Sequence, residues 1–172
     1  MNAKNATRHL ASRLQKSGDA TRAFFGGLRP QDWQHTVYRG GSQWPVRAVL
    51  AHFVSAESAM QELLQDILCS NPGAPADFDI DAFNESEVKR LGRRDPQELL
   101  LDFKAARAAT VALVEGMSAP DLQRRGRHPW LGNAPLSKII KLIYRHNQIH
   151  ERDTRRALRA RAANPIAQEH IP

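Results

Sequence analysis

The stretch LSKIIKLIYRHNQIHERDTRRALRAR, residues 136–161, carries the pattern that decides the fold. One stripe along it follows the spacing i, i+3, i+4, i+7 that is typical of a helix face turned toward a core. The stripe consists of Leu136, Ile139, Ile143, His146, His150, Asp153 and Ala157. Two histidines occupy positions where the pattern predicts Leu or Ile. Because they are four residues apart, their side chains leave one helix face about 6 Å from each other and can bind a single divalent metal ion.

A third histidine lies in a second apolar stretch, WPVRAVLAHFVSAE at residues 44–57. His52 stands there beside Val49 and Phe53, on or at the edge of the predicted core face. An unpaired polar group in a core costs about 1–3 kcal/mol, so three such histidines require an account. Facing helices of a bundle often supply metal ligands, and three protein nitrogens with an open position are typical of a catalytic metal site. Two alternatives stay open: ordinary hydrogen bonds satisfy these imidazoles, or the helical phase is slightly different.

Four long amphipathic segments predict the fold. They cover residues 3–28, 44–69, 96–117 and 136–163, and a shorter helical signal lies within residues 77–91. Trp44 and Pro45 are expected to begin the second helix, and Asp95 to cap the third. We find no sustained alternation of apolar and polar residues, so no strand is predicted. These features predict an all-α, four-helix bundle formed by residues 1–163, with residues 164–172 as a C-terminal tail. The pattern leaves open how many connections cross over the bundle.

Composition narrows the class of protein. The 172 residues are enough for one domain with a sizeable core, and the net charge is +7. The arginine clusters lack interleaved aromatic residues, which favours solvated surface over nucleic-acid binding. No apolar run reaches the roughly 18 residues needed to cross a membrane, and no signal-peptide pattern is present. The single cysteine, Cys69, excludes an intramolecular disulfide, so we expect a cytoplasmic protein.

Several further polar residues are weighed as site candidates. Asp153, three residues after His150, could orient a ligand imidazole or pair with a neighbouring arginine. Glu57 is expected to be solvated, and Asn84 to cap a turn or reach the mouth of the site. His128 is expected on the surface, with the lining of a pocket as the alternative. Cys69 has no basic partner nearby in sequence, which argues against a nucleophile. No site context surrounds His9, His35 and His170.

Short motifs in a particular order add a family resemblance. WPVRAVLAH at residues 44–52, DAFN at 81–84, HPWLG at 128–132 and IKLIYRHNQIHERD at 140–153 resemble the DinB-like superfamily over nearly the whole chain. The resemblance implies an up-down-down-up four-helix bundle and, in many members, a homodimer. It also implies a metal site formed by His52, His146 and His150.

The resemblance implies function only by analogy. The superfamily includes thiol-dependent enzymes, among them mycothiol-dependent maleylpyruvate isomerase and bacillithiol transferases, and many DNA-damage-inducible proteins. We therefore expect a metal-dependent enzyme, either an S-transferase acting on thiol cofactors or a hydrolase. The expected cofactor is a divalent transition metal such as zinc, nickel or iron, and the expected partners are a small-molecule thiol or electrophile. The basic residues could attract an acidic thiol. The alternative is a non-catalytic metal-binding stress-response protein.

Overall fold

The computed structural model describes residues 3–40 and 43–163 of the chain, so the predicted C-terminal tail lies outside the described residues. The long helices are α1 (Ala3–Gly26), α2 (Val46–Leu68), α4 (Pro96–Glu115) and α5 (Leu136–Ala163). The shorter elements are α3 (Ile80–Leu91), η1 (Pro30–Asp32), η2 (Asp121–Gln123), β1 (Thr36–Tyr38), β2 (Trp44–Pro45), β3 (Arg125–His128) and β4 (Gly132–Pro135).

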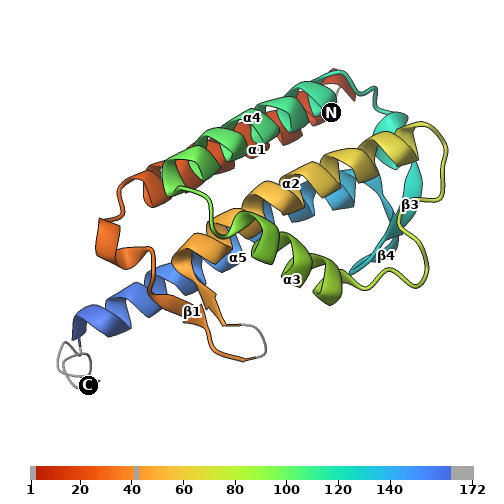
Figure 1. Ribbon diagram of the computed structural model, residues 1–172. Helices are drawn as coiled ribbons and strands as arrows, with labels where there is room; N and C mark the ends of the chain where they lie inside the picture. The colour runs from red at the N-terminus through yellow and green to blue at the C-terminus, as the bar shows by residue number, and fades with distance from the viewer. Residues whose placement is uncertain (1–2, 41–42, 164–172) are drawn as a thin grey trace.

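The four long helices pack as a bundle in which α1 contacts α4 and α5, and α2 contacts the same two helices. Figure 1 shows that α2 and α4 run in one direction while α1 and α5 run in the other, which is the up-down-down-up arrangement. Because α2 and α4 are parallel, the chain must return along the bundle between them. α3 lies in this return and packs against α2. The predicted fold class is therefore confirmed.

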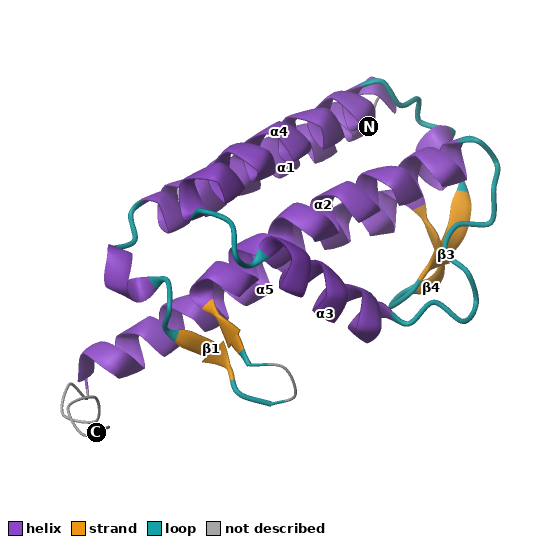
Figure 2. Ribbon diagram, in the orientation of Figure 1, coloured by secondary structure: helices purple, strands orange, loops and turns teal. Residues whose placement is uncertain are grey.

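Two short hairpins correct the prediction that the chain has no strands. β1 pairs with β2 and β3 pairs with β4, both antiparallel, at opposite ends of α2 and α5 (Figure 2). Each strand has only two to four residues, too few to show a period-two pattern in the sequence. Trp44 and Pro45 belong to β2, so α2 begins at Val46 with Pro45 as its N-cap. The β1–β2 hairpin lies beside the N-terminal half of α2.

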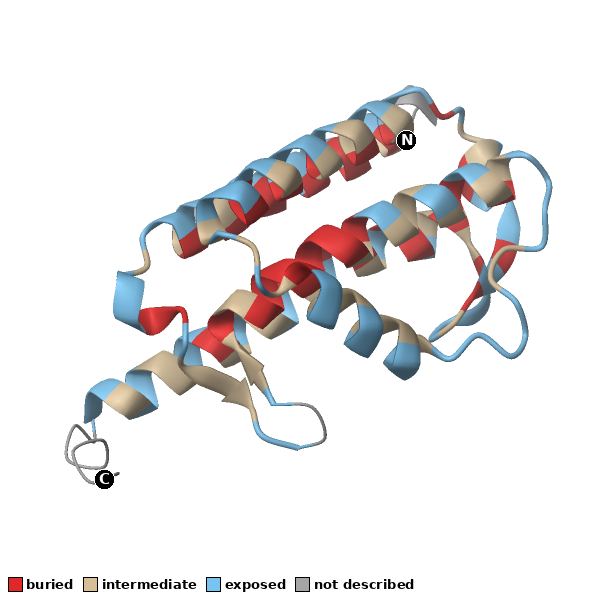
Figure 3. Cartoon of the chain, viewed as in Figure 1, coloured by how far each residue is buried: buried red, intermediate tan, exposed pale blue. Residues whose placement is uncertain are grey.

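The core follows the predicted stripes. Buried residues line the inner faces of the helices (Figure 3), and Phe53, Phe103 and Ile143 are among them. Asp95 caps α4 by accepting a hydrogen bond from the backbone N–H of Gln97 at 2.8 Å, as expected. Asp79 caps α3 in the same way. The amphipathic pattern thus places one face of α5 against α2, where the histidines meet.

Candidate metal centre

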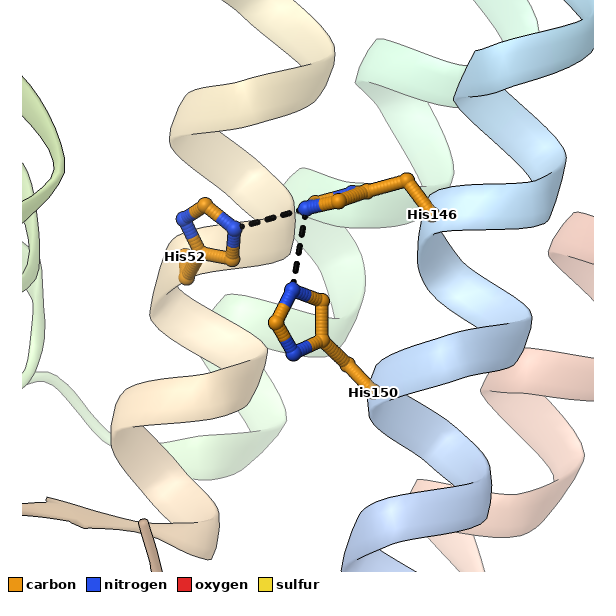
Figure 4. A group of neighbouring side chains, drawn as sticks. All are labelled: His52, His146 and His150. Atoms are coloured by element: carbon orange, nitrogen blue, oxygen red, sulfur yellow. Dashed lines mark hydrogen bonds between the residues drawn. The ribbon is translucent and has the colours of Figure 1, made fainter. Parts of the chain in front are cut away.

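The three predicted histidines converge at one point between α2 and α5. Nε2 of His146 lies 2.9 Å from Nε2 of His52 and 3.0 Å from Nε2 of His150 (Figure 4). One ring nitrogen from each residue lies within 4.8 Å of the others, a spacing that could hold a metal ion. His52 is buried, whereas the other two side chains are partly buried. The one-turn spacing of His146 and His150 and the packing of α2 on α5 produce this geometry.

Burial keeps the three imidazoles neutral. It lowers the pKa of His52 well below the ordinary value, and the neighbouring His146 and His150 add to this effect. The same cause lowers the pKa of His146 and takes that of His150 to about 4. Only a neutral imidazole has a lone pair for a metal ion. At neutral pH the cluster therefore offers nitrogen ligands rather than cations that repel one another.

A hydrogen-bonded relay fixes the tautomer of His150. The hydroxyl of Tyr38, at the end of β1, lies 2.6 Å from His150 Nδ1 and donates to Asp153 Oδ2 at 3.1 Å. Burial and the charge of Asp153 raise the pKa of Tyr38, so the phenol keeps its proton. Because that proton goes to a carboxylate, His150 Nδ1 must donate to the phenol oxygen. His150 Nε2 then carries no proton and turns its lone pair toward the other two rings.

The tautomer of His150 indicates whether the three histidines suit a bound metal ion. If His150 Nε2 has only a lone pair, His146 Nε2 cannot accept hydrogen bonds from both neighbours, although both lie within 3.0 Å of it. If His146 Nε2 carries a proton instead, it has one N–H for two neighbouring nitrogens. Hydrogen bonds therefore leave one of the three Nε2 atoms without a full partner, whereas a cation would accept all three Nε2 lone pairs. Asp153 acts on His150 through the Tyr38 hydroxyl rather than by accepting an imidazole N–H directly, and its Oδ1 also lies 3.5 Å from Nη2 of Arg156, as the alternative predicted.

A buried ion pair next to the cluster was missed by the sequence analysis. Glu57 was expected to be solvated, but its side chain is only 1% exposed. Its two carboxylate oxygens accept hydrogen bonds from Nε and Nη2 of Arg107, each at 2.7 Å. Arg107 Nη1 also donates to the carbonyl of Leu14 at 2.9 Å. Burial has the largest effect on the pKa of His146 and lowers it, while the charges of Glu57 and Arg107 act on it in opposite directions. The ion pair as a whole therefore adds no net charge beside the histidines.

A cavity of about 970 Å³ opens beside the histidines, and His52 and His146 are among its lining residues. Asn84 lines it from within α3, which fits the second of its two expected roles, reaching the site, and not the cap or turn role. His128 lines it as well and is 1% exposed, so the expectation of a surface position was wrong. His128 ends β3, whose alternate residues face inward, but four residues are too few to reveal that alternation in advance.

The remaining candidates lie outside the cluster. Cys69 is exposed at the end of α2, and His9 is exposed on α1. His35 Nε2 lies 3.1 Å from the carbonyl oxygen of Ala157. His170 lies outside the described residues. No helix described between residues 3 and 163 is long and apolar enough to cross a lipid bilayer.

The fold and the site together define a class: a four-helix bundle with three converging histidines beside an open cavity. A sequence model of the DinB superfamily matches residues 13–153, so the chain belongs to the DinB superfamily. A search of curated protein sequences finds no match.

Solved structures share this fold at low sequence identity. YfiT from Bacillus subtilis, described as a probable metal-dependent hydrolase with an unusual four-helix bundle topology, is 18% identical with a TM-score of 0.76, covering 91% of this chain and 87% of YfiT. The mycothiol-dependent maleylpyruvate isomerase is 13% identical with a TM-score of 0.69, covering 90% of this chain but only 63% of the isomerase. The colibactin self-resistance protein ClbS, solved with double-stranded DNA, is 11% identical with a TM-score of 0.70, covering 88% and 94% respectively.

The hydrogen bonds of Tyr38 with His150 and Asp153 predict that loss of the Tyr38 hydroxyl weakens metal binding without abolishing it. Tyr38→Phe removes the hydroxyl group that orients His150 and keeps the aromatic ring that packs edge-on against it. We expect metal affinity to fall about tenfold, the usual scale for losing a partner that orients a ligand. Competition with a chromogenic chelator would measure this. Unchanged affinity would mean that Tyr38 does not orient His150.

The lowered histidine pKa values predict acid sensitivity of the metal-free protein. An unfolded histidine titrates near pH 6.5, whereas the folded pKa of both His150 and His128 is about 4. Below pH 6.5 the unfolded chain therefore binds protons that the folded chain does not. We expect full stability above pH 6.5 and a loss of about 1.4 kcal/mol per pH unit for each such histidine as the pH falls toward 4. Urea denaturation with a chelator present would show this, and a flat profile from pH 6.5 to 4.5 would contradict it.

Proposed function

We propose that His52, His146 and His150 bind one divalent transition metal ion, and that the protein is a metal-dependent enzyme. The observation that carries the proposal is the convergence of Nε2 of all three rings on one point beside a cavity. The hydrogen bonds of Tyr38 with His150 and Asp153 direct the Nε2 lone pair of His150 to that point. Zinc, nickel and iron all accept imidazole ligands.

A divalent ion in such a site acts as a Lewis acid and lowers the pKa of a coordinated water or thiol toward neutrality. The residues of the chain do the rest. Asp153 and Tyr38 hold His150 in one orientation, and burial keeps the three imidazoles unprotonated at neutral pH. The mainly apolar walls of the cavity offer a surface for the apolar part of a substrate beside the histidines. This arrangement suits activation of a small nucleophile for attack on an electrophile held in the cavity.

The two reaction classes that fit are hydrolysis, with water as the nucleophile, and S-transfer, with a thiolate. Among structures of the same fold, YfiT is described as a probable metal-dependent hydrolase, and the isomerase is described as mycothiol-dependent, which is compatible with a thiol at the site. Because these proteins are at most 18% identical to the chain, they support the class of chemistry and not a substrate.

Elemental analysis of freshly purified protein, followed by two assays, tests the proposal. We expect about one transition metal ion per chain, and turnover of nitrophenyl esters or of a thiol with chlorodinitrobenzene that is lost with a chelator and restored by metal. Absence of metal binding under all conditions would overturn the metal site. Stoichiometric metal without turnover of any ester or thiol would overturn the enzyme and leave the non-catalytic metal-binding protein.

A further inference from the structure

Four arginines lie on one face of α5, spaced i, i+3, i+4 and i+7 along the helix: Arg152, Arg155, Arg156 and Arg159. They line a groove between α5 and α1, the arginine groove, together with Glu151 and with small or uncharged side chains of both helices. The stripe that carries the histidines lies on another face of α5. The arginine groove is therefore separate from the candidate metal centre, and the expectation that basic residues attract an acidic thiol to the histidines finds no support in it.

Positive charge exceeds negative charge along this groove. Arg152 and Arg156 share the carboxylate of Asp153 at 3.7 and 3.5 Å, and their side chains are still 75% and 81% exposed. Arg159 is exposed and forms no ion pair with any described residue. Ion pairs between exposed side chains contribute little to stability, so Asp153 does not hold the two arginines in place. These three guanidinium groups are thus available to an external anion.

Arg155 differs from the other three arginines. It pairs with Glu151 at 2.6 Å, and its guanidinium carbon lies 3.9 Å from the ring centre of Phe24 on α1. This cation–π contact covers the aromatic ring from the side of the arginine. Arg155 therefore joins α5 to α1, while the other three arginines carry the excess charge.

The spacing of the arginines indicates the kind of anion. Arg152 and Arg159 are seven residues apart, which is about 10 Å along the helix. One strand of a nucleic-acid duplex carries about three phosphates over this length. A row of exposed guanidinium groups therefore matches a linear series of phosphates better than it matches one small anion.

The lining of the groove argues against two other ligands that carry phosphates. Among the described residues that line it, none is aromatic and none has a large apolar side chain. The bases of a single strand stack on aromatic rings, and a helix that binds a lipid surface inserts apolar side chains into it. The lack of aromatic residues, which weighed against nucleic acid in the sequence, thus argues against single strands but not against the phosphates of a duplex.

We propose that the arginine groove binds the phosphate backbone of double-stranded nucleic acid without sequence preference, through Arg152, Arg156 and Arg159. Guanidinium groups form paired, charge-assisted hydrogen bonds with phosphate oxygens. Because contacts to phosphates carry no sequence information, the affinity depends on salt and not on sequence. The inference does not rest on the proposed function, and the binding needs no metal ion.

Fluorescence anisotropy of a labelled DNA duplex of about 20 base pairs tests the proposal, with the full chain, a chelator and salt from about 0.05 to 0.2 M. The test variant combines Arg152→Gln, Arg156→Gln and Arg159→Gln. We expect it to bind at least about tenfold more weakly at the lowest salt. The slope of log affinity against log salt is expected to be less steep by about three, one for each phosphate contact that is lost.

The matched control replaces three exposed arginines outside the groove by Gln: Arg39, Arg93 and Arg127. All six substituted side chains are exposed, so neither variant disturbs the core. The control loses the same net charge, and we expect it to keep the affinity and the salt slope of the wild type. If both variants lose affinity equally, binding follows the net charge of the chain and the proposal is wrong.

Two further ligands separate a duplex from other carriers of phosphate: the single strand of the same length and vesicles of phosphatidylglycerol. We expect the wild type to bind the duplex more tightly than the single strand, and duplexes of different sequence equally. Tighter binding of the single strand would overturn the proposal. So would a groove variant that loses binding to the vesicles and keeps binding to the duplex. Because a chelator is present throughout, these results are independent of whether the metal site or the turnover is confirmed.

Discussion

Arg107→Met is expected to lower the free energy of unfolding by about 3–5 kcal/mol, because it leaves the carboxylate of Glu57 buried without its partner. In the wild type the two side chains are 3% and 1% exposed and are joined by two hydrogen bonds of 2.7 Å. Arg107 also donates to the carbonyl of Leu14 on α1. With its amide oriented to satisfy both neighbours, Asn147 on α5 accepts from Arg107 at 3.0 Å. The arginine thus connects all four long helices.

Urea denaturation at pH 7.5 would measure the loss, and a double variant provides the control. Glu57→Leu combined with Arg107→Met removes both charges and fills the space with apolar atoms. We expect the double variant to be clearly more stable than Arg107→Met alone, since replacing a whole buried pair is often nearly neutral. A loss below about 1 kcal/mol in the single variant would show that solvent reaches Glu57.

The ion pair also shows why part of the core could not be predicted. Sequence periodicity places Thr110 and Phe103 on the inner stripe of α4, and both are 0% exposed. A charged residue on such a stripe, such as Arg107, does not indicate whether another helix carries its ion-pair partner. Here the partner is Glu57, which lies 50 positions away in sequence. Gly18 on α1 makes room for the arginine, because a Cβ there would lie 2.7 Å from Cγ of Arg107.

The histidine cluster was predictable for a physical reason that does not extend to its surroundings. A helix fixes the relative position of residues four apart, so His146 and His150 could be paired from sequence, and His52 followed from its own apolar stripe. Tyr38 could not be placed, because it reaches His150 through a hairpin whose strands are three and two residues long. His128 was misplaced for the same reason. Contacts between residues on one helix face can be predicted from the sequence. Contacts made by short irregular segments cannot, because they depend on the assembled fold.

Metal binding is expected to raise the melting temperature of the wild type by about 5–10 °C, and His146→Ala is expected to abolish this rise. A ligand at 100 times its dissociation constant stabilises by about 2.7 kcal/mol, and for a chain of this length 1 kcal/mol corresponds to about 2–4 °C. His146 is the central member of the cluster, since its Nε2 is the atom that lies within 3.0 Å of both other rings. Without it, His52 and His150 do not form a three-nitrogen site.

The comparison is made on the difference between melting temperatures with and without zinc or nickel, measured by calorimetry. Any change in the stability of the metal-free variant then cancels. His9→Ala is the matched control, because His9 is exposed on α1 and is not one of the three histidines that converge. His35 is a less suitable control, since its ring contacts the carbonyl of Ala157 on α5. We expect the control to keep the full rise. A His146→Ala protein that is still stabilised as strongly as the wild type would place the metal elsewhere, and the chemistry proposed for this cluster would then fail with it.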